Sequence, residues 1–254
     1  MPVLVGTSGW QYSDWRGAFY PKELPQRLWL EYYASCFSTV EVNNAFYRLP
    51  DRAVFESWRD RTPEGFVVGV KASRYLTHVK RLRDPAEPVA RLLDRAAGLG
   101  NKLGPVLLQL PPSLRRDLGA LDETLASFPP EVRVAVEPRH DSWFVDETAE
   151  LLARRRAAYC LVDPRKGAPS WRTTDWGYIR FHEGRSRPRP HYGRAALRNW
   201  AERLAELFGT TATVYAYFNN DMHACAPRDA ATFARILRQV GMTAALGPVL
   251  DGDR

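Results

Sequence analysis

Short segments of apolar and β-branched residues recur along the whole chain, and most gaps between them show helical periodicity. The apolar segments cover residues 3–8, 39–44, 66–72, 105–110, 132–137, 157–163, 178–183 and 213–219. The helical periodicity covers residues 27–35, 52–61, 87–99, 118–128, 147–155, 195–208 and 228–240. Strands that alternate with helices predict βα units around a parallel sheet. Eight such units in 254 residues predict one α/β domain, a (β/α)8 TIM barrel spanning residues 1–254.

The sixth unit departs from this pattern. Between the sixth and seventh segments the chain reads DPRKGAPSWRTTDWG, with proline, glycine and tryptophan. This composition predicts a loop, so that the sixth helix is short or missing. An open doubly wound sheet is the alternative architecture, but no GxGxxG turn follows the first predicted strand. No linker, internal repeat or low-complexity segment divides the chain.

Charged residues fall on one face of several predicted strands. Side chains alternate between faces along a strand, so Val40 and Val42 share one face while Glu41 and Asn43 share the other. The outer face of a barrel strand packs against apolar helices, and the polar face is therefore expected to point inward. The charged inward positions are Glu41, Lys71, Glu137 and Arg180, with Asn43, Gln109, Asp163 and His182 beside them.

The histidines follow the same geometry. All five fall at or just beyond the C-terminal ends of predicted strands: His78, His140, His182, His191 and His223. Active sites of TIM barrels lie at that end of the barrel. We therefore expect two or more of the histidines to line one site.

The charge balance points to an anionic partner. The net charge is +7, and 31 of the 36 basic residues are arginine, whose guanidinium suits phosphate and carboxylate groups. The alternative is a solvated surface, because runs such as LARRRAA lie on predicted helices. No apolar run approaches the roughly 20 residues of a membrane helix. The sequence shows no signal peptide, and its three cysteines have no metal-finger spacing, so we expect a reduced, cytoplasmic protein without a membrane partner.

Seven motifs occur together in one order: TSGWQYSDWRGAFYP, TVEVNNAFYRLP, VKASRYLTH, LGPVLLQLPP, VEPRHDSW, YIRFH and VYAYFNND. Over about residues 3–241 the chain thereby resembles the YecE-like family (domain of unknown function 72). The resemblance implies a (β/α)8 barrel and no agreed reaction. The barrel is similar in outline to the endonuclease IV and xylose isomerase types, which bind divalent metals. Two motifs differ from the common pattern, because Glu183 separates His182 from Gly184 and Asp229 replaces an asparagine.

Acid–base chemistry is the first hypothesis for the inward residues. A buried carboxylate beside a histidine can act as general base, so Glu41 or Glu137 would be the base. The proton partner would be His140 or His182, and Lys71 or Arg180 would stabilise developing negative charge. The alternative is a set of interior ion pairs, such as Glu41 with Lys71. The residues predicted to bind substrate are Asn43, Gln109, Arg139, Trp143, Asn219, Asn220 and Asp221.

Two further sites are chemically available. A divalent metal could use Glu41, Glu137, His140, Asp163, His182, Asp221 and His223, although these have no local ligand spacing. Arg139 and Arg180 would also crowd such a metal. Arg185, Arg187 and Arg189 follow the seventh strand, where TIM barrels often bind phosphate, and they predict an anion site.

The sequence therefore predicts an enzyme, most simply a hydrolase, that acts on an anionic phosphorylated or nucleotide-like substrate at the C-terminal barrel mouth. No cofactor is assigned, and a divalent metal stays an option. One alternative is a non-catalytic nucleic-acid-binding protein that uses the basic and aromatic rim. Another is a metal-dependent sugar isomerase or hydrolase. The substrate, the reaction and the oligomeric state stay open.

Overall fold

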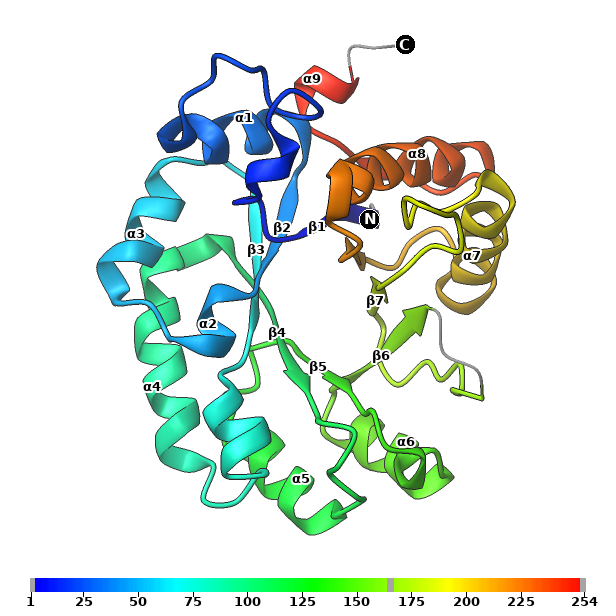
Figure 1. Cartoon of the computed structure of the whole chain (residues 1–254). Coiled ribbons are helices and arrows are strands. Elements are labelled where there is room, and N and C mark those ends of the chain that lie inside the picture. Colours follow the sequence, from blue (N-terminus) through cyan, green and yellow to red (C-terminus); the bar gives the residue numbers. More distant parts are fainter. Residues whose placement is uncertain (1–2, 164–166, 252–254) are drawn as a thin grey trace.

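Eight parallel strands close into a barrel in the computed structural model, which describes residues 3–163 and 167–251 (Figure 1). The strands are β1 (Val3–Ser8), β2 (Thr39–Val42), β3 (Val67–Lys71), β4 (Leu103–Gln109), β5 (Val134–Glu137), β6 (Ala158–Asp163), β7 (Gly177–Phe181) and β8 (Val214–Phe218). Consecutive strands are hydrogen-bonded neighbours, and β1 pairs in parallel with both β2 and β8, which closes the barrel. The (β/α)8 fold predicted from the sequence is confirmed.

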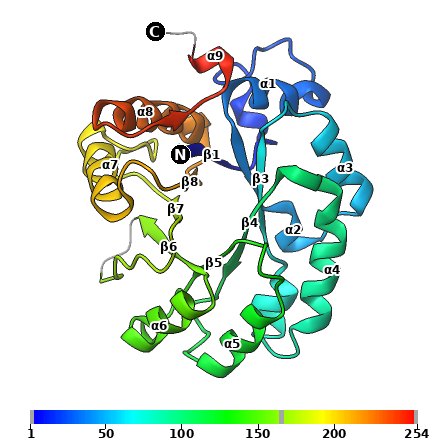
Figure 2. The same ribbon diagram turned by 180° about the vertical axis from the view of Figure 1, so that it is seen from behind.

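Helices surround the barrel, as the view from behind shows (Figure 2). The longer ones are α1 (Trp29–Cys36), α3 (Arg52–Asp60), α4 (Ala86–Ala96), α5 (Leu118–Ala126), α6 (Asp146–Arg154), α7 (Arg194–Phe208) and α8 (Cys225–Gln239). Three short elements were not predicted: α2 (Asn44–Tyr47), α9 (Pro248–Asp251) and β9 (Ala244–Ala245), which pairs with the start of β1. None of the helices in the described ranges is long and apolar enough to span a bilayer.

The connection from β6 to β7 contains no helix in residues 167–176. The loop predicted for the sixth unit is therefore confirmed over this part, whereas residues 164–166 of the same motif lie outside the described residues.

Two layers of different chemistry fill the barrel interior. Toward the N-terminal ends of the strands, buried aromatic and small side chains pack together, namely Leu107, Ala135, Ala158, Cys160, Trp176, Tyr178, Tyr215 and Tyr217. Gly69 makes room for this layer, because a Cβ at Gly69 would lie 3.0 Å from the Tyr217 hydroxyl. Above the aromatic layer the inward positions are charged, so the polar barrel mouth predicted from the strand alternation is present in the structure.

Candidate functional site

The centre of the barrel mouth is a guanidinium that bridges two carboxylates. Arg180 on β7 donates through Nη1 to Glu137 Oε2 on β5 and through Nη2 to Glu41 Oε1 on β2, each at 2.8 Å. All three side chains are at most 1 % exposed. Buried charges need partners of this kind, because each would otherwise lose its hydration without compensation. We call this group the Glu–Arg–Glu bridge.

Glu41 is held by neutral donors as well. The Ser8 hydroxyl at the end of β1 donates to Oε1 at 2.7 Å, and the Tyr178 hydroxyl on β7 donates to Oε2 at 2.6 Å. The register explains the first contact, since Ser8 lies directly opposite Glu41 in the parallel β1–β2 pair. Both carboxylate oxygens of Glu41 are therefore occupied by donors of the barrel wall.

Glu137 is the most heavily coordinated side chain of the mouth. Besides Arg180, its carboxylate accepts from Gln109 Nε2 at 2.9 Å and Arg139 Nε at 2.8 Å, and His182 Nε2 lies 3.4 Å from Oε1. Burial alone would raise the pKa of Glu137. The charge of Arg180, followed by His182 and Arg139, outweighs burial and holds this pKa well below its ordinary value. Both carboxylate oxygens of Glu137 are therefore occupied by donors, and the general-base role expected for Glu137 stays a prediction.

Lys71, at the end of β3, is buried like Glu137 but lies against an aromatic ring and not among polar partners. Its side chain is buried, at 9 % exposure, and Nζ lies 3.9 Å from the centroid of the Phe46 ring. Within the described residues, no hydrogen bond or ion pair to Nζ is present. Burial, reinforced by the charge of Arg180, lowers the pKa of Lys71 to about 8. The Glu41–Lys71 ion pair considered from the sequence is not formed, because Arg180 takes that place.

His182 lies on the solvent side of the Glu–Arg–Glu bridge. Asn219 Nδ2 contacts His182 Nδ1 at 3.2 Å, and Arg139 Nη2 contacts His182 Nε2 at 3.4 Å. Its side chain is 19 % exposed and that of Arg139 is 35 % exposed. The structure thus brings together predicted residues from β2, β3, β4, β5, β7 and β8, namely Glu41, Lys71, Gln109, Glu137, Arg139, Arg180, His182 and Asn219.

Asn43 lies beside this group, just after β2. Its Nδ2 donates to the Ser8 carbonyl at 3.4 Å, while Oδ1 is buried and has no hydrogen-bond partner in residues 3–163 and 167–251. The Nε of Arg180 is likewise buried and unpartnered within the same ranges. Such atoms are costly unless a ligand or water satisfies them.

Two predicted residues of the VEPRHDSW motif have local structural roles instead. His140 Nδ1 accepts from the backbone N–H of Ser142 at 3.1 Å and so caps the 3-10 turn η5 (Asp141–Trp143). Trp143 is completely buried, and its indole N–H donates to the Leu114 carbonyl at 2.8 Å. The structure therefore places Trp143 in the packing of the loop and gives His140 no contact with the two glutamates.

Asn220 and Asp221 also lie apart from the bridge. Asn220 Nδ2 donates to the Pro190 carbonyl at 2.9 Å and to Asp229 Oδ2 at 2.8 Å, so it ties the loop before α7 to α8. The Asp221 carbonyl accepts the indole N–H of Trp15 at 2.8 Å. These contacts hold the loops after β7 and β8 in place.

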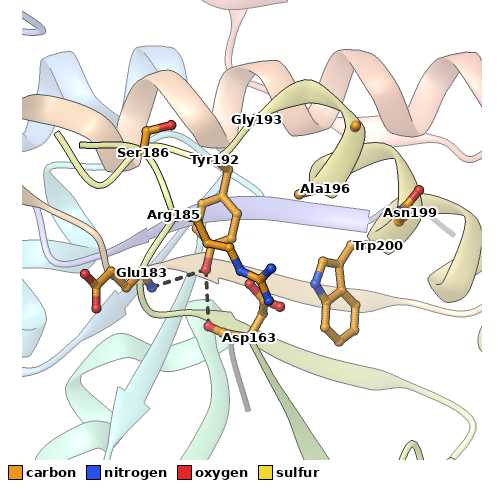
Figure 3. A pocket seen from close by; sticks show the side chains of 10 residues that line it. Asp163, Glu183, Arg185, Ser186, Tyr192, Gly193, Ala196, Asn199 and Trp200 are labelled. Carbon is orange, nitrogen blue, oxygen red and sulfur yellow. Dashed lines mark hydrogen bonds between the residues drawn. The ribbon is translucent and has the colours of Figure 1, made fainter. Parts of the chain in front are cut away.

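Asp163 corrects the predicted inward set. It falls on the helix-facing side of β6, where it lines a cavity of about 560 Å³ between the end of β6, the loop after β7 and the first turns of α7 (Figure 3). The Tyr192 hydroxyl donates to the Asp163 carbonyl and accepts from the Glu183 N–H, both at 3.2 Å. Of the three arginines predicted to form an anion site here, Arg185 lines the cavity, whereas Arg187 pairs with Glu183 at 3.1 Å.

Metal binding finds little support in these positions. The described part of the chain contains no group of three or more His, Cys, Asp or Glu side chains arranged to hold a metal ion. Glu41 and Glu137, the two carboxylates nearest the barrel axis, are both engaged by Arg180. In this arrangement the predicted ligands do not fit a metal.

Sequence reasoning missed Ser8 and Tyr178 as ligands of Glu41, and Phe46 as the surface under Lys71. Ser8 could have been found from its place at the end of the first strand. Tyr178 could have been found because it shares the inward face with Arg180, two residues away.

The fold makes the chain a TIM-barrel protein, and its barrel mouth holds the buried Glu–Arg–Glu bridge. The chain belongs to the DUF72 family, a family of proteins of unknown function whose profile matches residues 4–249. The family resemblance drawn from the seven motifs is thereby confirmed.

Relatives agree with this assignment. The chain is 35 % identical to the UPF0759 protein YecE of Escherichia coli K12 over 154 residues, which cover 60 % of this chain and 54 % of YecE, about half its length. It is 26 % identical to the UPF0759 protein YunF of Bacillus subtilis over 253 residues, covering 86 % and 89 % of the two chains. A DUF72 family protein from Thermotoga maritima matches with a TM-score of 0.83 and 30 % identity, over 94 % of this chain and all of that one.

Proposed function

We propose that the protein is an enzyme that binds a small anionic substrate, phosphorylated or nucleotide-like, at the C-terminal mouth of the barrel. The observation that carries the proposal is Lys71, a buried cation that forms no ion pair within the described residues, while both neighbouring glutamates are engaged by Arg180. An anion in the mouth would supply the missing partner. Arg139, which is about one third exposed, would extend the same cationic surface, and the buried Nε of Arg180 is a further donor without a partner in the described ranges.

The roles differ from those expected for a glutamate-dependent hydrolase. In this proposal Glu41 and Glu137 position Arg180, and the reactive group is the amine of Lys71. His182 would transfer a proton to or from the substrate, since its ring is partly exposed and contacts both Glu137 and Asn219. The lowered pKa of Lys71, about 8, keeps a useful fraction of the amine neutral near physiological pH.

Anion binding can be measured by titration calorimetry with inorganic pyrophosphate and with adenosine monophosphate. Lys71→Met and Arg139→Gln are each expected to weaken binding about 10- to 100-fold, because a charge-assisted hydrogen bond contributes roughly 1.5–3 kcal/mol. The matched control is Arg155→Gln, whose side chain is also 35 % exposed but pairs with Asp122 on the outside of the barrel. Affinity that stays unchanged in both mouth variants would contradict the proposal.

A second candidate, nucleic-acid binding, rests on the aromatic rim. Tyr47 is 77 % exposed next to Arg48, and both Lys80 and Arg91 lie over the Tyr75 ring, at 5.9 and 5.6 Å from its centroid. Exposed aromatic rings beside cations suit stacking of single-stranded bases.

This candidate predicts affinity for an oligonucleotide that falls steeply with salt, because phosphate contacts release counterions. Replacing Tyr47 by alanine would weaken it several-fold, since stacking contributes about 1–3 kcal/mol per base. Fluorescence anisotropy at two salt concentrations is the measurement. Weak binding that Tyr47→Ala leaves unchanged would exclude the rim as a stacking surface.

A further inference from the structure

The chain contains five lysines, and in the part that the structure describes Lys71 and Lys102 are buried, each in a different setting. Lys102, 8 % exposed, donates from Nζ to the carbonyls of Arg59 and Thr62 and to the Thr62 hydroxyl. Lys71, 9 % exposed, has an aromatic ring in place of acceptors. Burial lowers the pKa of Lys102 as well, but three oxygen acceptors bind its ammonium form, which is the structural use of a buried lysine. For Lys71, burial and the nearby charge of Arg180 disfavour the ammonium, and the face of the Phe46 ring offsets this only in part, so that a fraction of the amine keeps its nitrogen lone pair available.

We propose that Lys71 is a Schiff-base lysine, whose Nζ condenses with the carbonyl of an aldehyde or ketone that also carries a phosphate or carboxylate. The inference rests on the proposed function, since it names the reaction and substrate class of the same site. Lysines that form imines are typically desolvated in an apolar pocket or lie next to another cation. Lys71 has both features, since its side chain is only 9 % exposed and the fixed charge of Arg180 lies nearby.

The condensation can be balanced with groups already in the mouth. The Nζ lone pair attacks the carbonyl carbon, and the carbonyl oxygen takes up a proton while the nitrogen loses one, giving a carbinolamine. Elimination of the hydroxyl as water then leaves the C=N bond, so that amine and carbonyl become imine and one water. No oxidant or reductant is required.

A proton carrier contacts the same aromatic ring as the amine. The His78 ring packs edge-on against Phe46, with 4.9 Å between the ring centroids, and its Nδ1 lies 2.8 Å from the Thr77 hydroxyl. Burial, followed by the charge of Lys71, lowers the pKa of His78. His78 lies in the π-helical turn η3 (Tyr75–Val79), a distortion that is frequent at functional sites. A neutral imidazole can accept and return the proton during dehydration.

The anionic part of the substrate is set by the rest of the mouth. Arg139 is about one third exposed, and Arg180 Nε is a buried donor without a partner in the described ranges. The phosphate or carboxylate of the substrate would accept hydrogen bonds from the two arginines, while the aldehyde or ketone carbon of the same molecule lies near Nζ. An uncharged carbonyl compound of the same size would lack these contacts.

The test is reductive trapping. The purified full-length protein is incubated with glycolaldehyde phosphate or glyoxylate, reduced with borohydride, and analysed by intact mass and peptide mapping. We expect one adduct, equal in mass to the probe minus one water plus two hydrogens, located on Lys71. Lys102 serves as the internal control and stays unlabelled. Uncharged glycolaldehyde should label Lys71 at least about tenfold less, reflecting the lost charge-assisted contacts.

Two variants separate this inference from the proposed function. Lys71→Arg keeps the charge, so it should still bind pyrophosphate yet form no adduct, and Lys71→Met should lose both; circular dichroism checks that each is folded. Wild-type protein that binds pyrophosphate but forms no adduct on Lys71 would overturn the Schiff base and leave the anion site intact. Labelling spread evenly over the five lysines would overturn it as well. Wild-type protein that neither binds pyrophosphate nor forms an adduct would refute the proposed function as well.

Discussion

Replacing Arg180 by methionine is expected to lower the free energy of unfolding by about 3–5 kcal/mol at neutral pH, because two buried carboxylates would lose the cation between them. Both 2.8 Å ion pairs of the Glu–Arg–Glu bridge depend on this one guanidinium. Glu41 and Glu137 are completely buried, so water cannot replace the lost contacts without opening the barrel. Urea denaturation at pH 7 measures the effect.

At acid pH the difference in the free energy of unfolding between the wild type and this variant should become smaller. In the wild type the pKa of Glu137 is held well below its ordinary value, so the stability that Glu137 contributes is present above the ordinary carboxyl pKa and is lost as pH falls toward the folded-state pKa. Without Arg180, burial would instead raise that pKa, and the variant would gain relative stability once its carboxylates protonate. Repeating the denaturation near pH 4 tests this sign.

The control is Arg155→Met. Arg155 pairs with Asp122 at 2.7 Å, but both side chains are about one third exposed, and exposed pairs contribute about 1 kcal/mol or less. Equal losses for the Arg180 and Arg155 variants would show that the bridge contributes no more than a surface pair.

The sequence predicted the inward residues well where a strand alternates strictly. Glu41, Lys71, Glu137 and Arg180 all lie in the mouth because side chains of a strand alternate between its faces and the helices claim the apolar face. Asp163 was assigned wrongly. Cys160 belongs to the interior layer, and a residue three positions later on the same strand must lie on the opposite face. Counting from Cys160 would have placed Asp163 outside.

The partners of these residues could not be predicted in the same way. Sequence alone offered Lys71 as the neighbour of Glu41, since their strands are adjacent. The structure pairs Glu41 with Arg180 from β7, because the long guanidinium side chain reaches across the barrel. The local contacts of His140 and Trp143 could not be predicted for another reason. Their roles depend on a 3-10 turn and on a carbonyl from the preceding loop, which no strand periodicity reveals.

Lys71→Met is expected to make the protein more stable at pH 7, by about 1–3 kcal/mol. The pKa of Lys71 is lowered from 10.5 to about 8 in the folded protein, which corresponds to at most roughly 3.4 kcal/mol of unfavourable charging. This penalty is fully present below pH 8, where the lysine is protonated in both states. It disappears as pH rises toward 10.5, because the folded state then no longer carries the buried charge while the unfolded state still does.

The stability difference between the wild type and Lys71→Met should therefore shrink as pH rises from 8 to 10.5, whatever other groups titrate in both proteins. Lys102→Met provides the contrast, since its loss of acceptor contacts should destabilise the protein throughout this range. A Lys71→Met variant that is less stable than the wild type at pH 7 would mean that the ammonium has a partner in solution. A stabilised variant that also loses pyrophosphate binding would mean that the barrel retains a destabilising cation for its chemistry, as functional sites often do.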